Sequence, residues 1–257
     1  MSYKDILVYL DAGPFLESRL EAAVALARRH GARLTGVDVS TEAAFEGEWR
    51  PRVEALQETF ETQARRAALE FQFRTADRQP IGNLHAHYAD LFVATQSHKD
   101  TEHLALAGVP EQVLLNAGAP GLILPCWWQP KPLGRSVVVA WNATREATRA
   151  VHDALPILRM AEKVVVFAFE PNYEAKNADV TAIVAHLARH GVKTSVDGWS
   201  DTGEISAVDA LFSTLDTADA DLIVAGAFGH SRWLEGLFGG VSRDLLGQES
   251  MAVLMSH

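Results

Sequence analysis

The sequence predicts an α/β protein built from two tandem, doubly wound, parallel-sheet domains. Short apolar runs rich in β-branched residues alternate with longer amphipathic segments. Near-continuous apolar strands separated by helices indicate a parallel sheet that helices cover on both faces. The same order of elements restarts after a proline-rich stretch in the middle of the chain. We therefore expect two copies of one domain.

The expected elements follow one another in a regular order. Apolar residues three and four positions apart mark the helices, and β-branched runs mark the strands. In the first half we expect a strand at Ile6–Leu10, a helix at Leu16–His30 ended by Gly31, a strand at Leu34–Val39, a helical segment over Arg52–Phe73 and a strand at Asp90–Ala94. In the second half we expect strands at Val137–Ala140, Val164–Phe169, Lys193–Trp199 and Leu222–Ala225, with helices at Glu146–Arg159, Asp179–His190 and Ile205–Leu215.

A linker separates the halves, because prolines between Pro125 and Gly134 remove backbone donors and forbid a helix. We place the first domain at residues 1–126, the linker at 127–134 and the second domain at 135–257. A register test supports the repeat. One constant offset along the chain relates Ala89–Ala94 to Ala220–Ala225, Asp11 to Asn142, and Leu114–Leu115 to Leu245–Leu246. The offset from Ala25–Leu26 to Ala154–Leu155 is slightly shorter, which a loop difference absorbs.

Composition excludes several function classes. The 257 residues are 48% apolar and 22% charged, and the net charge of −10 disfavours nucleic acids and acidic membranes as partners. No apolar run approaches the roughly 20 residues of a membrane helix. Cys126 is the single cysteine, and no export leader is recognisable, so we expect a cytoplasmic protein.

The strongest local signal is a glycine-rich segment that follows the strand Leu222–Ala225. Ligands of open α/β sheets bind at the carboxyl ends of strands. Gly226 and Gly229 allow a bound group to approach the backbone, and Gly239 with Gly240 opens a helix whose first N–H groups favour phosphate. Ser242 adds a hydroxyl group. The alternative interpretation is that these glycines only form tight turns.

This segment resembles the glycine motif of the universal stress protein family, in which Gly226, Gly229 and Gly239 have the expected spacing. The resemblance extends over the whole chain and implies two Rossmann-like domains related by a pseudo-twofold axis. It further implies an adenine nucleotide, ATP or else ADP or AMP, bound in the second domain of a stress-response sensor or regulator. The implied nucleotide-binding residues are Ala140, Asn142, Ala168, Gly226, Gly229, Gly239, Gly240, Val241 and Ser242.

Two positions depart from the family pattern. Gly240 replaces a Ser or Thr, which removes one hydrogen bond worth about 1 kcal/mol. Asn142 replaces an Asp, and the missing charge argues against Mg²⁺ as a cofactor. In the first half only Gly108 of the motif is present, while Thr95, His98, Val109 and Glu111 stand at the other positions. We therefore expect the first half not to bind nucleotide in this way.

Other readings compete with a nucleotide sensor. A non-nucleotide interaction protein, with a pocket that Trp141 blocks or that takes another small ligand, is the alternative. No nucleophile elbow, Walker loop or zinc-protease motif is present, so we assign no catalytic residue and expect at most slow ATP hydrolysis. His85 and His87 are two residues apart and share no helix face, so we assign no metal site. The two domains are expected to pair within one chain, and a homodimer is left open.

Overall fold

The computed structural model describes residues 2–39, 49–75, 83–96, 109–170, 180–200, 205–227, 245 and 251–257. The chain divides into two compact units, Met1–Lys131 and Pro132–His257. This division falls inside the segment 127–134 that the sequence marks as a linker.

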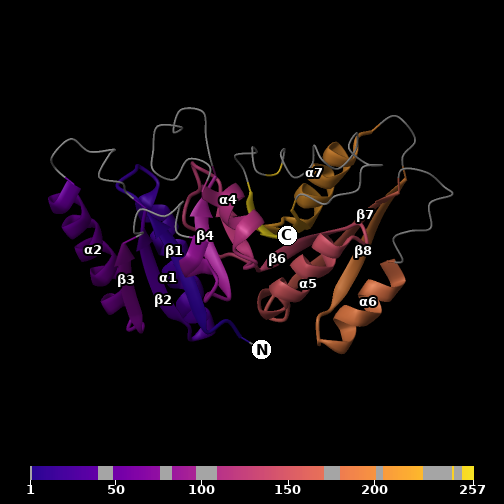
Figure 1. The fold of residues 1–257 in the computed structure, drawn as a ribbon. Helices are drawn as coiled ribbons and strands as arrows, with labels where there is room; N and C mark the ends of the chain where they lie inside the picture. The colour runs from indigo at the N-terminus through magenta and orange to yellow at the C-terminus, as the bar shows by residue number, and fades with distance from the viewer. Residues whose placement is uncertain are drawn as a thin grey trace. The chain divides into compact units, whose positions relative to one another are not determined.

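The first unit is a parallel sheet with strand order β3-β2-β1-β4-β5 (Figure 1). Strand β1 lies in the middle, paired with β2 on one side and β4 on the other. The elements are β1 (Asp5–Leu10), α1 (Leu16–His30), β2 (Arg33–Asp38), α2 (Trp49–Arg66), β3 (Phe71–Thr75), α3 (Asn83–Ala86), β4 (Leu91–Thr95), α4 (Val109–Asn116) and β5 (Gly121–Leu124).

The second unit repeats this order as β8-β7-β6-β9-β10, again with parallel pairing. In Figure 1, helices α5 and α6 lie on one face of this sheet and α7 lies on the other. The elements are β6 (Ser136–Trp141), α5 (Arg145–Leu158), β7 (Lys163–Glu170), α6 (Val180–Arg189), β8 (Thr194–Ser200), α7 (Ala207–Ala218), β9 (Leu222–Gly226) and β10 (Ala252–Ser256). The predicted class, tandem doubly wound α/β, is confirmed.

The repeat keeps its predicted register. One offset relates the first residues of β1 and β6, of β4 and β9, and of β5 and β10. The offset between α1 and α5 is slightly shorter, as the sequence indicated for this part of the repeat. The end of α1 at Gly31 is also confirmed, since this glycine adopts the left-handed conformation with φ 61°.

One predicted element was wrong. The helical segment assigned to Arg52–Phe73 ends at Arg66 as α2, and Phe71–Thr75 forms the edge strand β3. Phe71 and Phe73 alternate with polar residues, and the centroids of both rings lie 6.1 Å from that of Phe60 on α2. Packing against the helix therefore outweighs the helix-forming composition of the segment.

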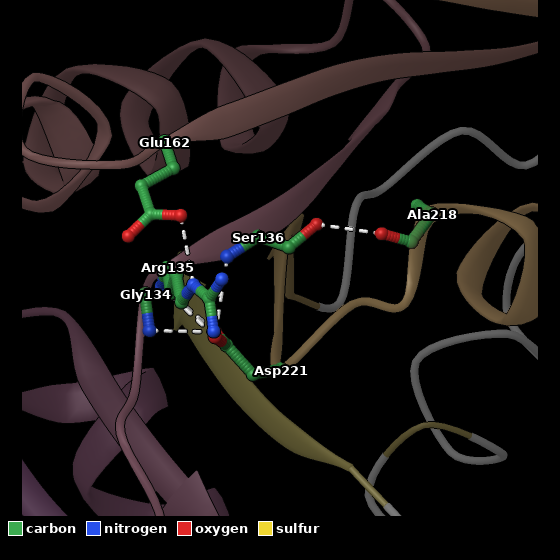
Figure 2. A network of polar contacts seen from close by, with 6 residues as sticks. All are labelled: Gly134, Arg135, Ser136, Glu162, Ala218 and Asp221. Atoms are coloured by element: carbon green, nitrogen blue, oxygen red, sulfur yellow. Dashed lines mark hydrogen bonds and ion pairs between the residues drawn. The ribbon is translucent and has the colours of Figure 1, made fainter.

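An aspartate that recurs in both halves holds the start of the central strand in each unit. Figure 2 shows Asp221 accepting hydrogen bonds from the backbone N–H groups of Gly134, Arg135 and Ser136, at 2.6 to 3.1 Å. Asp90, the equivalent residue of the first half, accepts the N–H groups of Lys4 and Asp5 at 2.6 and 3.0 Å. The repeated Ala-Asp-Leu segments thus have a structural role at the amino end of each sheet.

The core of each unit consists of its strands and the buried residues of its helices. Every residue of β4, β5 and β10 is buried, as a sheet covered on both faces requires. Among the residues that the structure describes, no helix has the length and apolarity needed to cross a bilayer.

Candidate functional site

The described site residues come together at the carboxyl ends of three adjacent strands in the second unit. Strand β6 ends with Ala140 and Trp141, and Asn142 follows directly. Register pairs Trp141 with Ala168 on β7, and Ala140 with Ala225 on β9, one residue before Gly226. Four residues that the sequence singled out therefore lie together at one edge of the sheet, where 'edge' here means the border formed by the carboxyl ends of its strands. These residues are Ala140, Asn142, Ala168 and Gly226.

This edge is the topological switch point of the sheet. The chain leaves β6 through α5 to β7 on one side, and it later reaches β9 on the other side of β6. Connections that diverge from one central strand leave a crevice above its carboxyl end, where ligands of open α/β sheets bind. The fold therefore places the predicted residues where a ligand site is expected.

Asn142 shapes the turn between β6 and α5. Its Oδ1 accepts hydrogen bonds from Thr144 Oγ1 at 2.8 Å and from the Thr144 backbone N–H at 3.3 Å. Thr144 in turn caps α5, because its Oγ1 accepts the N–H of Ala147 at 3.2 Å. Ala143 between them has a φ of 56°, which a non-glycine residue adopts only at some cost. The side-chain oxygen of Asn142 is thus engaged within the turn.

Gly226 lies directly against the start of α5. A Cβ atom at this position would lie 2.6 Å from the backbone N of Ala147 and 2.7 Å from the carbonyl carbon of Glu146. The absence of a side chain therefore lets β9 and α5 pack closely. The next residue, Ala227, donates its N–H to Ser256 O at 2.8 Å, and its carbonyl oxygen lies 3.0 Å from His257 Nδ1. These contacts fix the backbone where the glycine-rich segment begins.

Trp141 brings an unsatisfied donor to this edge. Its side chain is partly buried, and its indole Nε1 is buried with no hydrogen-bond partner among the residues that the structure describes. An indole N–H only donates, and buried indole N–H groups usually find an acceptor. A polar ligand atom at the end of β6 would supply one.

The remaining predicted phosphate-binding residues, Gly229, Gly239, Gly240, Val241 and Ser242, lie outside the described residues. The start of α5 offers phosphate little, because Thr144 caps it and the nearly buried Glu146 adds a carboxylate to its first turn. This carboxylate suits the positive end of the helix dipole. A phosphate group would therefore depend on the segment after Gly226.

The equivalent edge of the first unit is occupied by a side chain of its own. Arg19 of α1 is 1% exposed and donates Nε to Tyr9 O at 2.7 Å, Nη1 to Thr95 Oγ1 at 2.8 Å and Nη2 to Asp11 Oδ1 at 2.6 Å. Burial lowers the pKa of this guanidinium, and the adjacent Asp11 carboxylate acts in the opposite direction. Arg19 thereby joins the ends of β1 and β4 in one buried ion-pair network.

The second unit has a short side chain at the corresponding helix position. Counting from the first residues of α1 and α5, Arg19 corresponds to Thr148, whose hydroxyl bonds within the helix to Thr144 O at 2.8 Å. Likewise Asp11 corresponds to Asn142, and Thr95 to Gly226. Sequence analysis identified the last two differences but missed Arg19. The signal was a lone arginine among the apolar positions of a helix.

Of the histidines considered in the sequence, the structure describes His85 and His87. His85 Nδ1 lies 3.3 Å from Arg74 Nη1, and His98 and His103 lie outside the described residues. Across the described ranges, no group of three or more His, Cys, Asp or Glu side chains is arranged to hold a metal ion.

Comparison with known proteins identifies the fold. No protein-family model and no curated protein sequence matches this chain. A universal stress protein structure from Archaeoglobus fulgidus DSM 4304 is similar, with a TM-score of 0.68 and 16% identity, covering 97% of this chain and 94% of its own. A protein of unknown function from Pseudomonas aeruginosa PAO1 has a TM-score of 0.64 and 14% identity, covering 98% and 92%.

Shorter universal stress protein structures match about half of the chain. One, in complex with cAMP, covers 49% of this chain and 99% of its own, with a TM-score of 0.38 and 18% identity. The full-length matches show that the chain has the fold of tandem universal stress protein structures. The resemblance inferred from the glycine motif is thus confirmed at the level of the fold.

Proposed function

We propose that the second unit binds an adenine nucleotide, ATP, ADP or AMP, at the carboxyl ends of β7, β6 and β9, and that the protein acts as a stress-response sensor or regulator. The contrast between the two units carries this proposal. Where the first unit fills the edge with Arg19, the second has Thr148, Asn142 and Gly226. The glycine spacing after β9 supplies the expected phosphate-binding segment.

The described residues fit the base and ribose end of such a ligand. Ala140 and Ala168 carry only methyl side chains at this end of the sheet, and Trp141 would offer its indole N–H to an acceptor on the base or ribose. Asn142 contributes no charge, and its side-chain oxygen already accepts two hydrogen bonds from Thr144. We therefore expect binding that does not depend on a Mg²⁺ ion held by Asn142.

The test begins with the untagged protein purified without added nucleotide. Denaturation and mass spectrometry of the released small molecules, followed by calorimetric titration with ATP, ADP and AMP, identify the ligand and its affinity. We expect close to one adenine nucleotide per chain, and binding that persists in EDTA. The variant Gly229→Trp should bind at least about tenfold more weakly. Gly198→Trp, at an exposed position of β8 with open space around it, is the matched control.

Two results would reject the proposal. One is the absence of released nucleotide together with no binding of ATP, ADP or AMP at millimolar concentration. The other is equal affinity of the Gly229→Trp variant and its control. In either case the alternative function, an interaction protein with a blocked or differently occupied pocket, takes its place. Incubation with ATP in the same experiments measures any hydrolysis.

A further inference from the structure

Three histidines lie together on the face of the second unit that α5 and α6 cover (Figure 1), away from the proposed nucleotide site. His152 Nε2 on α5 and His186 Nε2 on α6 lie 3.1 Å apart. His190, one turn after His186, places its ring centroid 4.7 Å from that of His186, and the centroids of His152 and His186 are 5.1 Å apart. The three rings form a continuous row across two helices.

The distance between the two Nε2 atoms suits shared coordination of one ion. With metal–nitrogen bonds of about 2.0 to 2.1 Å, two nitrogens 3.1 Å apart subtend an angle of about 100° at the metal. This value lies between the angles of octahedral and tetrahedral sites. The arrangement also allows a direct hydrogen bond between two neutral imidazoles, in which one ring donates and the other accepts. The metal and the hydrogen bond are the two explanations to be distinguished.

The third histidine is positioned to complete such a site. His190 follows the last residue of α6, and its N–H donates to His186 O at 3.3 Å, so the two side chains, four residues apart, lie on the same side of the helix end. Since the described residues hold no ready-made group of three ligands, His190 has to rotate about its side-chain bonds to join the pair. His190 is exposed, as is His152, and this exposure leaves room for the rotation and for entry of an ion.

We propose that His152, His186 and His190 bind one divalent late transition-metal ion, of the Zn²⁺, Ni²⁺ and Cu²⁺ class, that bridges α5 and α6. Imidazole nitrogen is a preferred ligand of these ions. The lowered pKa of His186, caused by burial and by the neighbouring His152, His190 and Arg189, favours the neutral form that a metal requires. The proposal is independent of nucleotide binding.

Calorimetric titration of the untagged, chelator-treated full chain with ZnCl₂ at about pH 7.5 tests the site. We expect one ion per chain with a Kd below about 10 µM. The variants His152→Gln and His186→Gln should each weaken binding at least about tenfold, and His190→Gln at least about threefold. His87→Gln, which removes an exposed histidine of the first unit, should leave binding unchanged. Circular dichroism of each variant confirms that it is folded.

Protonation and spectroscopy give a second, independent readout. Zn²⁺ affinity should fall between about pH 7.5 and pH 5.5, because protons compete for imidazole nitrogens. The electron paramagnetic resonance spectrum of the Cu²⁺-loaded protein should show nitrogen ligands that His186→Gln removes. The proposal is wrong if Zn²⁺ does not bind at about 100 µM, or if His186→Gln and His87→Gln bind it equally. Unchanged affinity in folded His190→Gln would overturn the third ligand.

Discussion

The buried Arg19 network offers the sharpest test of how the two units differ. In Arg19→Met, Asp11 stays in a site where it is 4% exposed and loses the cation that lies 2.6 Å from its Oδ1. Removing one partner of a buried ion pair costs about 3–5 kcal/mol. Losing the hydrogen bonds to Tyr9 O and Thr95 Oγ1 adds about 1 kcal/mol each. Burial of the methionine side chain returns about 1.5–3 kcal/mol.

The expected net loss is therefore about 2–5.5 kcal/mol, which lowers the Tm of the first unit by roughly 6 °C or more. Differential scanning calorimetry measures this shift. Arg65→Met is the matched control, because the ion pair of Arg65 with Glu61 is exposed and contributes well under 1 kcal/mol.

A double-mutant cycle separates the ion pair from simple packing. Asp11→Asn in the Arg19→Met background removes the uncompensated charge, so the two substitutions together should cost at least about 2 kcal/mol less than their separate costs combined. The reasoning is refuted if Arg19→Met stays within about 1 kcal/mol of the wild type, or if the two losses are additive.

Three further predictions concern other parts of the fold. Gly226→Ala should lose about 1–3 kcal/mol in chemical denaturation, because its Cβ meets the backbone of α5. No atom of the described residues lies within 4 Å of the Cβ position at Gly198, so Gly198→Ala should change stability by less than about 1 kcal/mol. Equal losses would contradict the packing argument. Burial lowers the pKa of His30 to about 4, so its neutral imidazole stabilises the fold above about pH 6.5, and this stabilisation is lost as the pH falls through 4. His30→Gln should therefore flatten the pH–stability curve between these values. An unchanged slope would count against this prediction. Asp221→Ala and Asp90→Ala should each cost about 1–3 kcal/mol in thermal melting, because backbone N–H donors at the start of a central strand lose their acceptor. Neutral effects at both positions would show that water satisfies these N–H groups equally well.

The fold was predictable because the apolar pattern, the helix-ending glycine and the internal repeat all indicated the same arrangement of strands and helices. The apolar strands, the helix end at Gly31 and the constant register of the repeat all depend on local pattern, and the structure follows them. Strand β3 was missed because its evidence is not local: Phe71 and Phe73 look like part of a polar helix until Phe60 packs against them. An edge strand defined by such tertiary contacts is difficult to recognise from composition.

The candidate site divides in the same way. The carboxyl-end positions of Ala140, Asn142, Ala168 and Gly226 follow from strand order and were expected. Their local roles were not, since the engagement of the Asn142 oxygen by Thr144 and the contact of Gly226 with α5 depend on atomic geometry. A glycine motif marks positions where another group approaches the backbone closely, but it does not identify that group. At Gly226 the structure shows that the group is the start of α5 in the same unit.

The two sheet edges also differ in charge in a way that bears on an anionic ligand. Asp11 and Arg19 together are neutral, and Asn142 and Thr148 together are neutral. Exchanging only one member of either pair would leave a charge without its partner, at a cost of several kcal/mol where the site is buried. The first unit therefore reaches neutrality with an ion pair that occupies the strand ends. The second carries no charge at Asn142 and Thr148, so a phosphate-bearing ligand would meet neither a carboxylate at position 142 nor an arginine at position 148, and Glu146 would be the carboxylate nearest to it among the described residues. This difference, rather than glycine spacing alone, is the physical reason to expect the nucleotide in the second unit.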